Sequence, residues 1–298
     1  MIDRLGRVGV WGHLDSLSAT DVRGYARRVE ELGFGMLWVP ETVAREPFAL
    51  LATIATATER LCLGTSIASI WARDAVTMRV GALTLQDLSG GRFVLGLGVS
   101  HAHLAQKVRG HVYERPLTRM REYLGAYHAA PWRGPAVPEE PPVVLAALRR
   151  RMLELAAQAT AGAFPYLVTP ERVAWMRGMI DGAADVTRRP LLLVTLPVVV
   201  DADPGTARTA ARGYLGPYLR TPNYQASWTE QGFEPADWEK PGGDRLVDAM
   251  VAWGDPEELA RRIGVMHDAG ADHVALIPLG SDGTTEHLPG LERLARHI

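Results

Sequence analysis

Residues 92–98 read Arg-Phe-Val-Leu-Gly-Leu-Gly, a short apolar run that follows the turn signal Ser89-Gly90-Gly91 and a stretch of helical period, Ala75–Leu88. A strand that is apolar along its whole length is typical of a parallel sheet whose two faces are covered by helices. This helix–turn–strand unit predicts an α/β protein, and its recurrence along the chain indicates which one.

The same unit recurs on both sides of residues 92–98. Eight apolar, β-rich runs alternate with longer segments of helical period. The runs are Arg7–Trp11, Gly35–Val39, Leu61–Ile67, Arg92–Gly98, Val143–Ala146, Gly162–Val168, Leu191–Val200 and His273–Pro278. The expected helices are Asp21–Leu32, Pro47–Thr58, Ala75–Leu88, Pro116–Ala130, Arg149–Thr160, Thr169–Gly182 and Glu258–Ala269. Eight such alternations with right-handed crossovers close into a (β/α)₈ TIM barrel, so we expect one barrel domain over residues 1–298.

Two segments are longer than plain barrel connections. Val99–Pro142 contains one expected helix and a proline-rich link, and Asp201–Gly254 carries several large aromatic residues. Long insertions at strand ends commonly cover an active site. We therefore expect insertions at the C-terminal face of the barrel, with residues 223–238 forming much of a substrate pocket.

The composition limits the kind of partner. The chain has 298 residues, a net charge of −2 and a single cysteine, Cys62, and no run of basic residues marks a nucleic-acid surface. The N-terminus lacks the apolar core of a signal peptide, and no stretch approaches the roughly 20 apolar residues that cross a bilayer. We expect a cytoplasmic protein that acts on a small molecule and binds neither nucleic acid nor membrane.

Candidate reactive side chains follow the first strands. Glu41 is the only carboxylate squarely at a strand end in the first half, where it has either a catalytic role or an ion pair with Arg45 or Arg73. His101 and His103 follow the fourth run. We predict no metal, because neighbouring strand ends lack matching ligands, and we favour a cofactor or anion contact for at least one of these histidines.

Other strand ends carry arginines and aromatic residues. Arg149-Arg150-Arg151 begins a helix directly after the fifth run, where free N–H groups and positive charge suit a phosphate. Four aromatic residues could pack on a flat cofactor or belong to the core, namely Trp11, Trp71, Tyr166 and Tyr224. His273 is most simply a solvent or packing residue.

Several of these stretches resemble a known family. Leu63–Ile67, the later Arg73 and Leu83–Leu85, and above all Leu88–Gly98, with its Ser-Gly-Gly-Arg-Phe-x-Leu-Gly-x-Gly block, are similar to the luciferase-like monooxygenase superfamily. The similarity is closest to its coenzyme F420-dependent oxidoreductases, and it runs from Gly9 to about Leu279.

The resemblance implies where a cofactor lies. The third strand carries a bulge, often with a cis non-proline peptide behind the middle ring, which corresponds to Ser66–Ile67. The cofactor phosphate lies near the loop after strand four, Val99–His101, and the turn after strand five, Ala146–Arg149. The predicted cofactor-binding residues are Thr65, Ser66, Ile67, Val99, Ser100, His101, Ala146, Ala147, Leu148, Arg149 and Tyr166.

The sequence departs from the family pattern at three places. Glu41-Thr42 stands where alcohol-oxidising members often have Asp-His, and Val99 replaces the usual acidic residue after strand four. Arg149-Arg150-Arg151 replaces Gly-Pro-Lys. The direction of hydride transfer is therefore open, and the candidate proton donors or acceptors are Glu41, His13 and His101, in that order.

These features predict an F420-dependent oxidoreductase that transfers hydride between the deazaflavin C5 and a small organic substrate. Homodimerisation is an expectation that the resemblance carries. One alternative is an FMN-dependent monooxygenase that uses reduced flavin and oxygen, and another is a non-catalytic cofactor-binding barrel.

Overall fold

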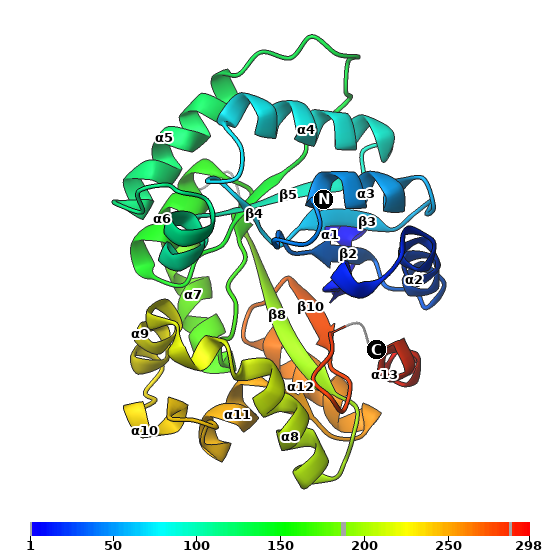
Figure 1. The fold of residues 1–298 in the computed structure, drawn as a ribbon, viewed down its shortest axis with the longest axis vertical. Coiled ribbons are helices and arrows are strands. Elements are labelled where there is room, and N and C mark those ends of the chain that lie inside the picture. The colour runs from blue at the N-terminus through cyan, green and yellow to red at the C-terminus, as the bar shows by residue number, and fades with distance from the viewer. Residues whose placement is uncertain (1, 186–188, 286–287) are drawn as a thin grey trace.

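Eight short apolar strands form the centre of the molecule, and each pairs in parallel with the next around a closed barrel (Figure 1). The computed structural model describes residues 2–185, 189–285 and 288–298. The strands are β1 Val8–Trp11, β2 Met36–Val39, β3 Cys62–Thr65, β5 Phe93–Gly98, β6 Val143–Leu145, β7 Gly162–Ala163, β8 Leu191–Val199 and β10 His273–Pro278. β10 pairs with both β8 and β1, which closes the ring and confirms the predicted (β/α)₈ barrel.

Two strands differ from their predicted bounds. The third run ends as a strand at Thr65, is followed by a cis peptide at Ser66–Ile67, and resumes as the short β4 Ala68–Ser69, which pairs with β5. The cis bond is the one that the resemblance implies. The sixth run forms β7, which ends at Ala163 instead of Val168, because Pro165 has no N–H with which to continue the ladder.

The expected helices all form, within about a turn of their predicted bounds. They are α2 Ala19–Glu31, α3 Pro47–Ala55, α4 Ala75–Leu88, α5 Pro116–Ala129, α6 Arg150–Ala159, α7 Pro170–Ala183 and α12 Pro256–Asp268. The Thr169 side chain caps α7 by accepting from the Arg172 N–H, and Ser18, one turn before the predicted start, caps α2 by accepting from Asp21. The apolar faces of these helices pack around the barrel and build its main core.

Most of the unpredicted elements lie in the second long segment. They are α8 Pro204–Leu215, η3 Tyr218–Arg220, α9 Pro222–Glu230, α10 Pro235–Trp238, α11 Asp244–Met250 and β9 Ala252–Trp253. These helices group beyond β8 (Figure 1), and β9 returns to pair in parallel with the end of that strand. Gly254 N–H donates to Val199 O at 3.2 Å, so the inserted segment, residues 201–254, leaves and rejoins the barrel at one place.

Four further elements complete the chain. These are α1 Ile2–Leu5, η1 Leu14–Ser16, the π-helix η2 Leu104–Val108 and α13 Leu288–Leu294. None of the helices within the described ranges is long and apolar enough to cross a membrane.

His273, the first residue of β10, makes two buried polar contacts. His273 is fully buried, with Nδ1 2.8 Å from Gly6 O and Nε2 3.1 Å from the indole N–H of Trp38. Burial lowers the pKa of His273 to about 4, so the ring is neutral at pH 7. The neutral tautomer that satisfies both contacts donates from Nδ1 and accepts at Nε2.

Candidate functional site

A cavity of about 880 Å³ opens at the carboxyl ends of the strands. Its walls are drawn from the ends of β1, β2, β5, β6, β7 and β8, together with the starts of α5 and α6 and the inserted helix α9. A cavity at this face of a TIM barrel is where such proteins hold ligands.

The cavity brings together nearly all the predicted site residues. They are His13, Glu41, Ser66, Ile67, Val99, Ser100, His101, Ala146, Ala147, Leu148, Arg149 and Tyr166. Thr65 is the exception, because it is not among the residues that line the cavity. Its side chain is fully buried, and its hydroxyl donates to Gly96 O at 2.8 Å and accepts from the Gly96 N–H at 3.0 Å. Thr65 therefore joins β3 to β5 and does not line the cavity.

The floor of the cavity is made by strand-end residues. The Trp11 indole N–H donates to Ser66 O at 3.3 Å, next to the cis Ser66–Ile67 peptide. Thr195, on β8, lines the floor with a buried hydroxyl that has no hydrogen-bond partner within the described part of the chain. Because a buried hydroxyl without a partner is costly, this atom is suited to bond a polar edge of a bound molecule.

One side of the cavity is basic, and we call it the basic wall: Arg115, Arg149, Arg150 and Arg151. Arg149 precedes α6 and donates to Asn223 Oδ1 at 3.1 Å, and Arg150 pairs with Glu154. Across the described ranges, Arg115 and Arg151 have no carboxylate within ion-pair distance, and neither α5 nor α6 has a side-chain cap at its start. Free N–H groups and unpaired guanidinium groups at two helix starts favour an anion.

The lining also includes four aromatic residues, and we call them the aromatic wall: Tyr166, Trp175, Tyr218 and Tyr224. The ring centroids of Tyr166 and Tyr218 are 5.5 Å apart, and those of Tyr218 and Tyr224 are 5.3 Å apart. The Trp11 ring lies 6.4 Å from Tyr166, which joins this wall to the floor. Trp71, predicted as a possible cofactor contact, lies outside this cavity and donates its indole N–H to Val99 O.

The two predicted histidines both line the cavity but differ in burial. Burial, and to a lesser extent the neighbouring His103, lowers the pKa of His101, whose ring lies 5.4 Å from that of Tyr224. His101 is therefore a neutral hydrogen-bonding group at pH 7. His13 is 44% exposed, with Nε2 3.3 Å from Asp15 Oδ2, so it sits at the open side of the cavity.

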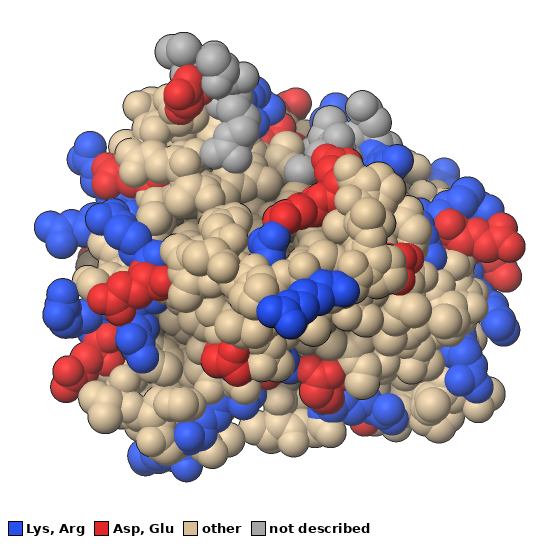
Figure 2. Space-filling view, turned by 90° about the horizontal axis from the view of Figure 1, so that it is seen from above, with Lys and Arg blue, Asp and Glu red and all other residues tan. Residues whose placement is uncertain are grey.

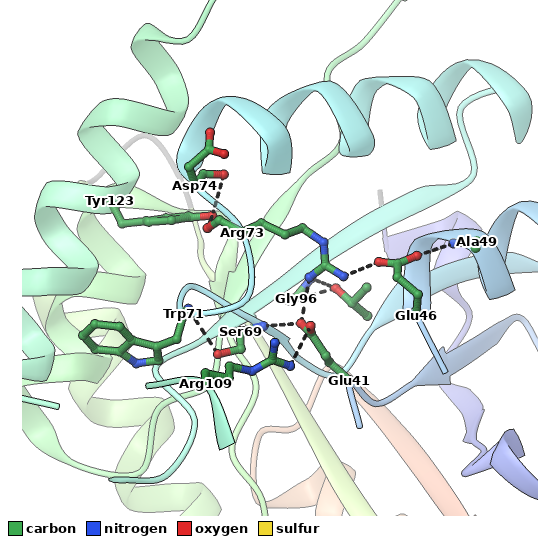
Figure 3. A network of polar contacts seen from close by, with 11 residues as sticks. Glu41, Glu46, Ala49, Ser69, Trp71, Arg73, Asp74, Gly96, Arg109 and Tyr123 are labelled. Atoms are coloured by element: carbon green, nitrogen blue, oxygen red, sulfur yellow. Dashed lines mark hydrogen bonds and ion pairs between the residues drawn. The ribbon is translucent and has the colours of Figure 1, made fainter. Parts of the chain in front are cut away.

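Glu41 is the centre of a polar network between β2, β4 and the loop after η2 (Figure 3). Its side chain is only 5% exposed, and one oxygen accepts from Arg73 Nη1 at 2.9 Å and from the Ser69 N–H at 2.7 Å. The other oxygen lies 3.1 Å from Arg109 Nη2. Of the two ion pairs that the sequence suggested, the one with Arg73 forms, whereas Arg45 donates to the carbonyl groups of Asp15 and Leu17.

Some cavity residues escaped sequence reasoning. Tyr218 and Trp175 were not singled out, because nothing in the local pattern distinguishes them from core aromatics. The Pro222-Asn223-Tyr224 start of α9 did carry a signal, since proline favours the first position of a helix. Of the segment expected to form the substrate pocket, Asn223, Tyr224 and Glu230 reach the cavity, but Phe233 and Trp238 pack beneath them.

The family described as luciferase-like monooxygenase matches residues 4–273 of this chain. A protein of Mycobacterium tuberculosis, whose name assigns it provisionally to the coenzyme F420-dependent oxidoreductases, is 24% identical over 89% of this chain and 91% of its own length.

Solved structures share the fold. The coenzyme F420-dependent tetrahydromethanopterin reductase of Methanopyrus kandleri has a TM-score of 0.78 at 16% identity, and 98% of each chain is covered. The oxygenating constituent of 3,6-diketocamphane monooxygenase of Pseudomonas putida, solved with FMN, has a TM-score of 0.74 at 14% identity, again over 98% of each chain.

Proposed function

Because this chain belongs to the luciferase-like monooxygenase family, we propose that it is an oxidoreductase that binds coenzyme F420 and transfers hydride between the deazaflavin and a small organic substrate. The observation that carries the proposal is a cavity over strand ends whose lining combines the four arginines of the basic wall with the four rings of the aromatic wall. The name of the Mycobacterium tuberculosis relative supports the choice of cofactor.

The cavity residues suit such a cofactor. Ser66 and Ile67 would lie behind the ring system. The Thr195 hydroxyl, which has no hydrogen-bond partner in the described structure, would bond to a polar edge of the ring. Val99–His101 and Ala146–Arg149 would hold the phosphate, with the first turn of α6 adding its N–H groups. F420 carries carboxylates beyond its phosphodiester, and Arg115, Arg149 and Arg151, which have no carboxylate partner within the described ranges, supply more positive charge than the single phosphate of FMN requires.

When bound, the deazaflavin supplies hydride chemistry, and the protein supplies orientation and a proton donor or acceptor. Catalytic roles for Glu41, His13 and His101 stay predictions. The contacts of Glu41 favour the ion-pair role over the catalytic one, because both carboxylate oxygens are occupied by Arg73, Arg109 and Ser69. His13 and His101 line the cavity and remain the better candidates of the three.

Titration of the purified protein with F420 and, separately, with FMN tests the proposal by fluorescence and absorbance. We expect F420 to bind and FMN to bind far more weakly. Arg151→Gln is expected to weaken F420 binding roughly 10- to 100-fold, since a charge-assisted hydrogen bond contributes roughly 1.5–3 kcal/mol. Arg220→Gln is the matched control, because Arg220 is exposed and lies outside the cavity lining.

Binding of FMN alone would contradict the proposal and favour the monooxygenase alternative. Binding of neither cofactor would reject both. We also propose that the protein forms a homodimer, as its family resemblance implies, and light scattering of the purified protein measures this directly.

A further inference from the structure

Three phenol groups meet beside the cavity floor. The Tyr166 hydroxyl is hydrogen-bonded to that of Tyr214, and it lies 3.0 Å from that of Tyr218. Tyr166 follows β7, Tyr214 lies in the last turn of α8, and Tyr218 begins η3. The inserted segment therefore places the hydroxyls of Tyr214 and Tyr218 beside the Tyr166 hydroxyl, which lies just after a barrel strand.

The three hydroxyls differ in access to the cavity. Tyr166 and Tyr218 line it, whereas Tyr214 is 7% exposed and is not among the lining residues. Burial raises the pKa of Tyr214 well above 10 and that of Tyr218 to about 12, so both neighbours keep their protons. When these two neighbours donate into the Tyr166 oxygen, the proton of Tyr166 is free to point at a bound molecule.

The residues around Tyr166 suit a role of its hydroxyl in proton transfer. Its ring lies 6.4 Å from that of Trp11, which is bonded to Ser66 O at the cavity floor. The titratable groups that approach from other elements are Tyr224, whose ring lies 5.9 Å from that of Tyr166, His13, which stacks on Trp11, and His101, which packs on Tyr224. No carboxylate within the described ranges bonds to the three phenols, so an anion on Tyr166 would be stabilised by hydroxyl donors and not repelled by a neighbouring charge.

We propose that Tyr166 is the proton donor of the reaction, that Tyr214 and Tyr218 are positioning residues that hold its hydroxyl, and that the substrate therefore carries a carbonyl-type acceptor on an apolar body. This inference rests on the proposed function. In the reductive direction, bound reduced F420 would supply hydride to the carbonyl carbon: the C–H bond of the cofactor and the C=O π bond would break, a C–H bond would form on the substrate, and the cofactor would be left oxidised. The Tyr166 O–H bond breaks, its proton forms the new O–H of the alcohol, and the phenolate regains a proton from water.

The hydroxyl cluster can be tested without cofactor or turnover. Protein labelled with 3-fluorotyrosine gives fluorine NMR signals, and the Tyr166 signal is the one absent from Tyr166→Phe. We expect Tyr214→Phe and Tyr218→Phe each to raise the ionisation midpoint of Tyr166 by about one pH unit or more, because a phenolate loses a hydrogen-bond donor. Tyr127→Phe is the matched control, since Tyr127 is buried outside the cavity and its hydroxyl has no partner in the described structure.

Two further measurements address the donor role. Benzaldehyde is expected to shift the Tyr166 fluorine signal, and toluene, which has the same ring without the oxygen, is expected to leave it in place. With F420 bound, Tyr166→Phe is expected to lower kcat roughly 100- to 1,000-fold at unchanged F420 affinity, as for loss of a general acid. The variants of Tyr214 and Tyr218 should lower kcat less and displace its pH profile.

Several outcomes overturn the inference. They are a Tyr166 midpoint indifferent to both neighbours, equal effects of benzaldehyde and toluene, and full activity of Tyr166→Phe. Failure of the wild-type protein to bind F420 is a different result. It rejects the proposed cofactor, while the fluorine NMR titration still reports on the three hydroxyls.

Discussion

At the scale of single residues, Arg73 makes two ion pairs whose carboxylates differ in burial. Its guanidinium bonds both Glu41, whose side chain is 5% exposed, and Glu46, whose side chain is 49% exposed (Figure 3). Glu41 also holds Arg109, so its removal leaves two cations without their buried counter-charge. Glu46 faces solvent, which screens its charge.

We predict that Glu41→Gln costs about 3 kcal/mol of unfolding free energy, as expected when one partner of a buried pair is removed. Glu46→Gln is expected to cost less than about 1 kcal/mol. Urea unfolding of both variants beside the wild type measures the two losses. Equal losses would show that the exposed contact is as important as the buried one.

Sequence reasoning reached part of this site. The position of Glu41 at a strand end suggested an ion pair with Arg73, which forms. The contact with Arg109 could not be predicted, because it depends on how the loop after η2 folds back over β2. The Tyr166 cluster was equally out of reach, since two of its three rings belong to a segment whose path the strand pattern does not determine.

At the scale of elements, the barrel depends on the close approach of β3 and β5. A side chain at Gly96 would collide with the Thr65 carbonyl oxygen, and one at Gly98 would collide with the Ile67 side chain. The glycines of residues 92–98 therefore allow neighbouring backbone and the cavity floor to lie against this strand.

We predict that Gly96→Ala destabilises the protein by about 3 kcal/mol or more, because backbone must move to admit the methyl group. Gly178→Ala is the matched control, since Gly178 lies inside α7 with open space around it. That substitution is expected to stabilise by about 0.5–1 kcal/mol. Thermal or urea unfolding gives both signs, and a neutral Gly96→Ala would contradict the packing argument.

The strength of the local pattern decided which elements could be predicted. The strands are continuous apolar runs and most barrel helices have a clear apolar face, so both were found from sequence. The inserted helices α9 and α10 are short, and their aromatic residues serve several neighbours at once. Proline at the start of α8, α9 and α10 was the remaining signal that could have located them.

At the scale of the whole molecule, basic and acidic side chains are interspersed on the face that Figure 2 shows, most densely toward its two sides. One buried titratable group, His273, makes the stability of the protein depend on pH. Its pKa is about 4 in the folded protein and 6.5 when exposed, so the unfolded chain binds an extra proton between these values.

We predict that stability is full above about pH 6.5 and falls by roughly 3 kcal/mol, from this residue, as the pH drops toward 4. Urea unfolding between pH 7 and 4.5 measures the fall. His273→Gln should be less stable at pH 7 but should lose much less on acidification, whereas His128→Gln, on the exposed surface of α5, should keep the wild-type dependence. An unchanged dependence in His273→Gln would assign the effect to other groups.

The place where the inserted segment joins the barrel has an evolutionary consequence. Residues 201–254 leave the barrel at the end of β8 and return to the same place, where the Gly254 N–H donates to Val199 O. The whole segment could therefore be exchanged as one unit. Its exchange for another of different length leaves the connectivity of every barrel strand intact. A lineage can thus exchange Tyr218, Asn223 and Tyr224 of the cavity lining by replacing one contiguous stretch of gene, while the arginines of the basic wall, which lie outside that stretch, are kept.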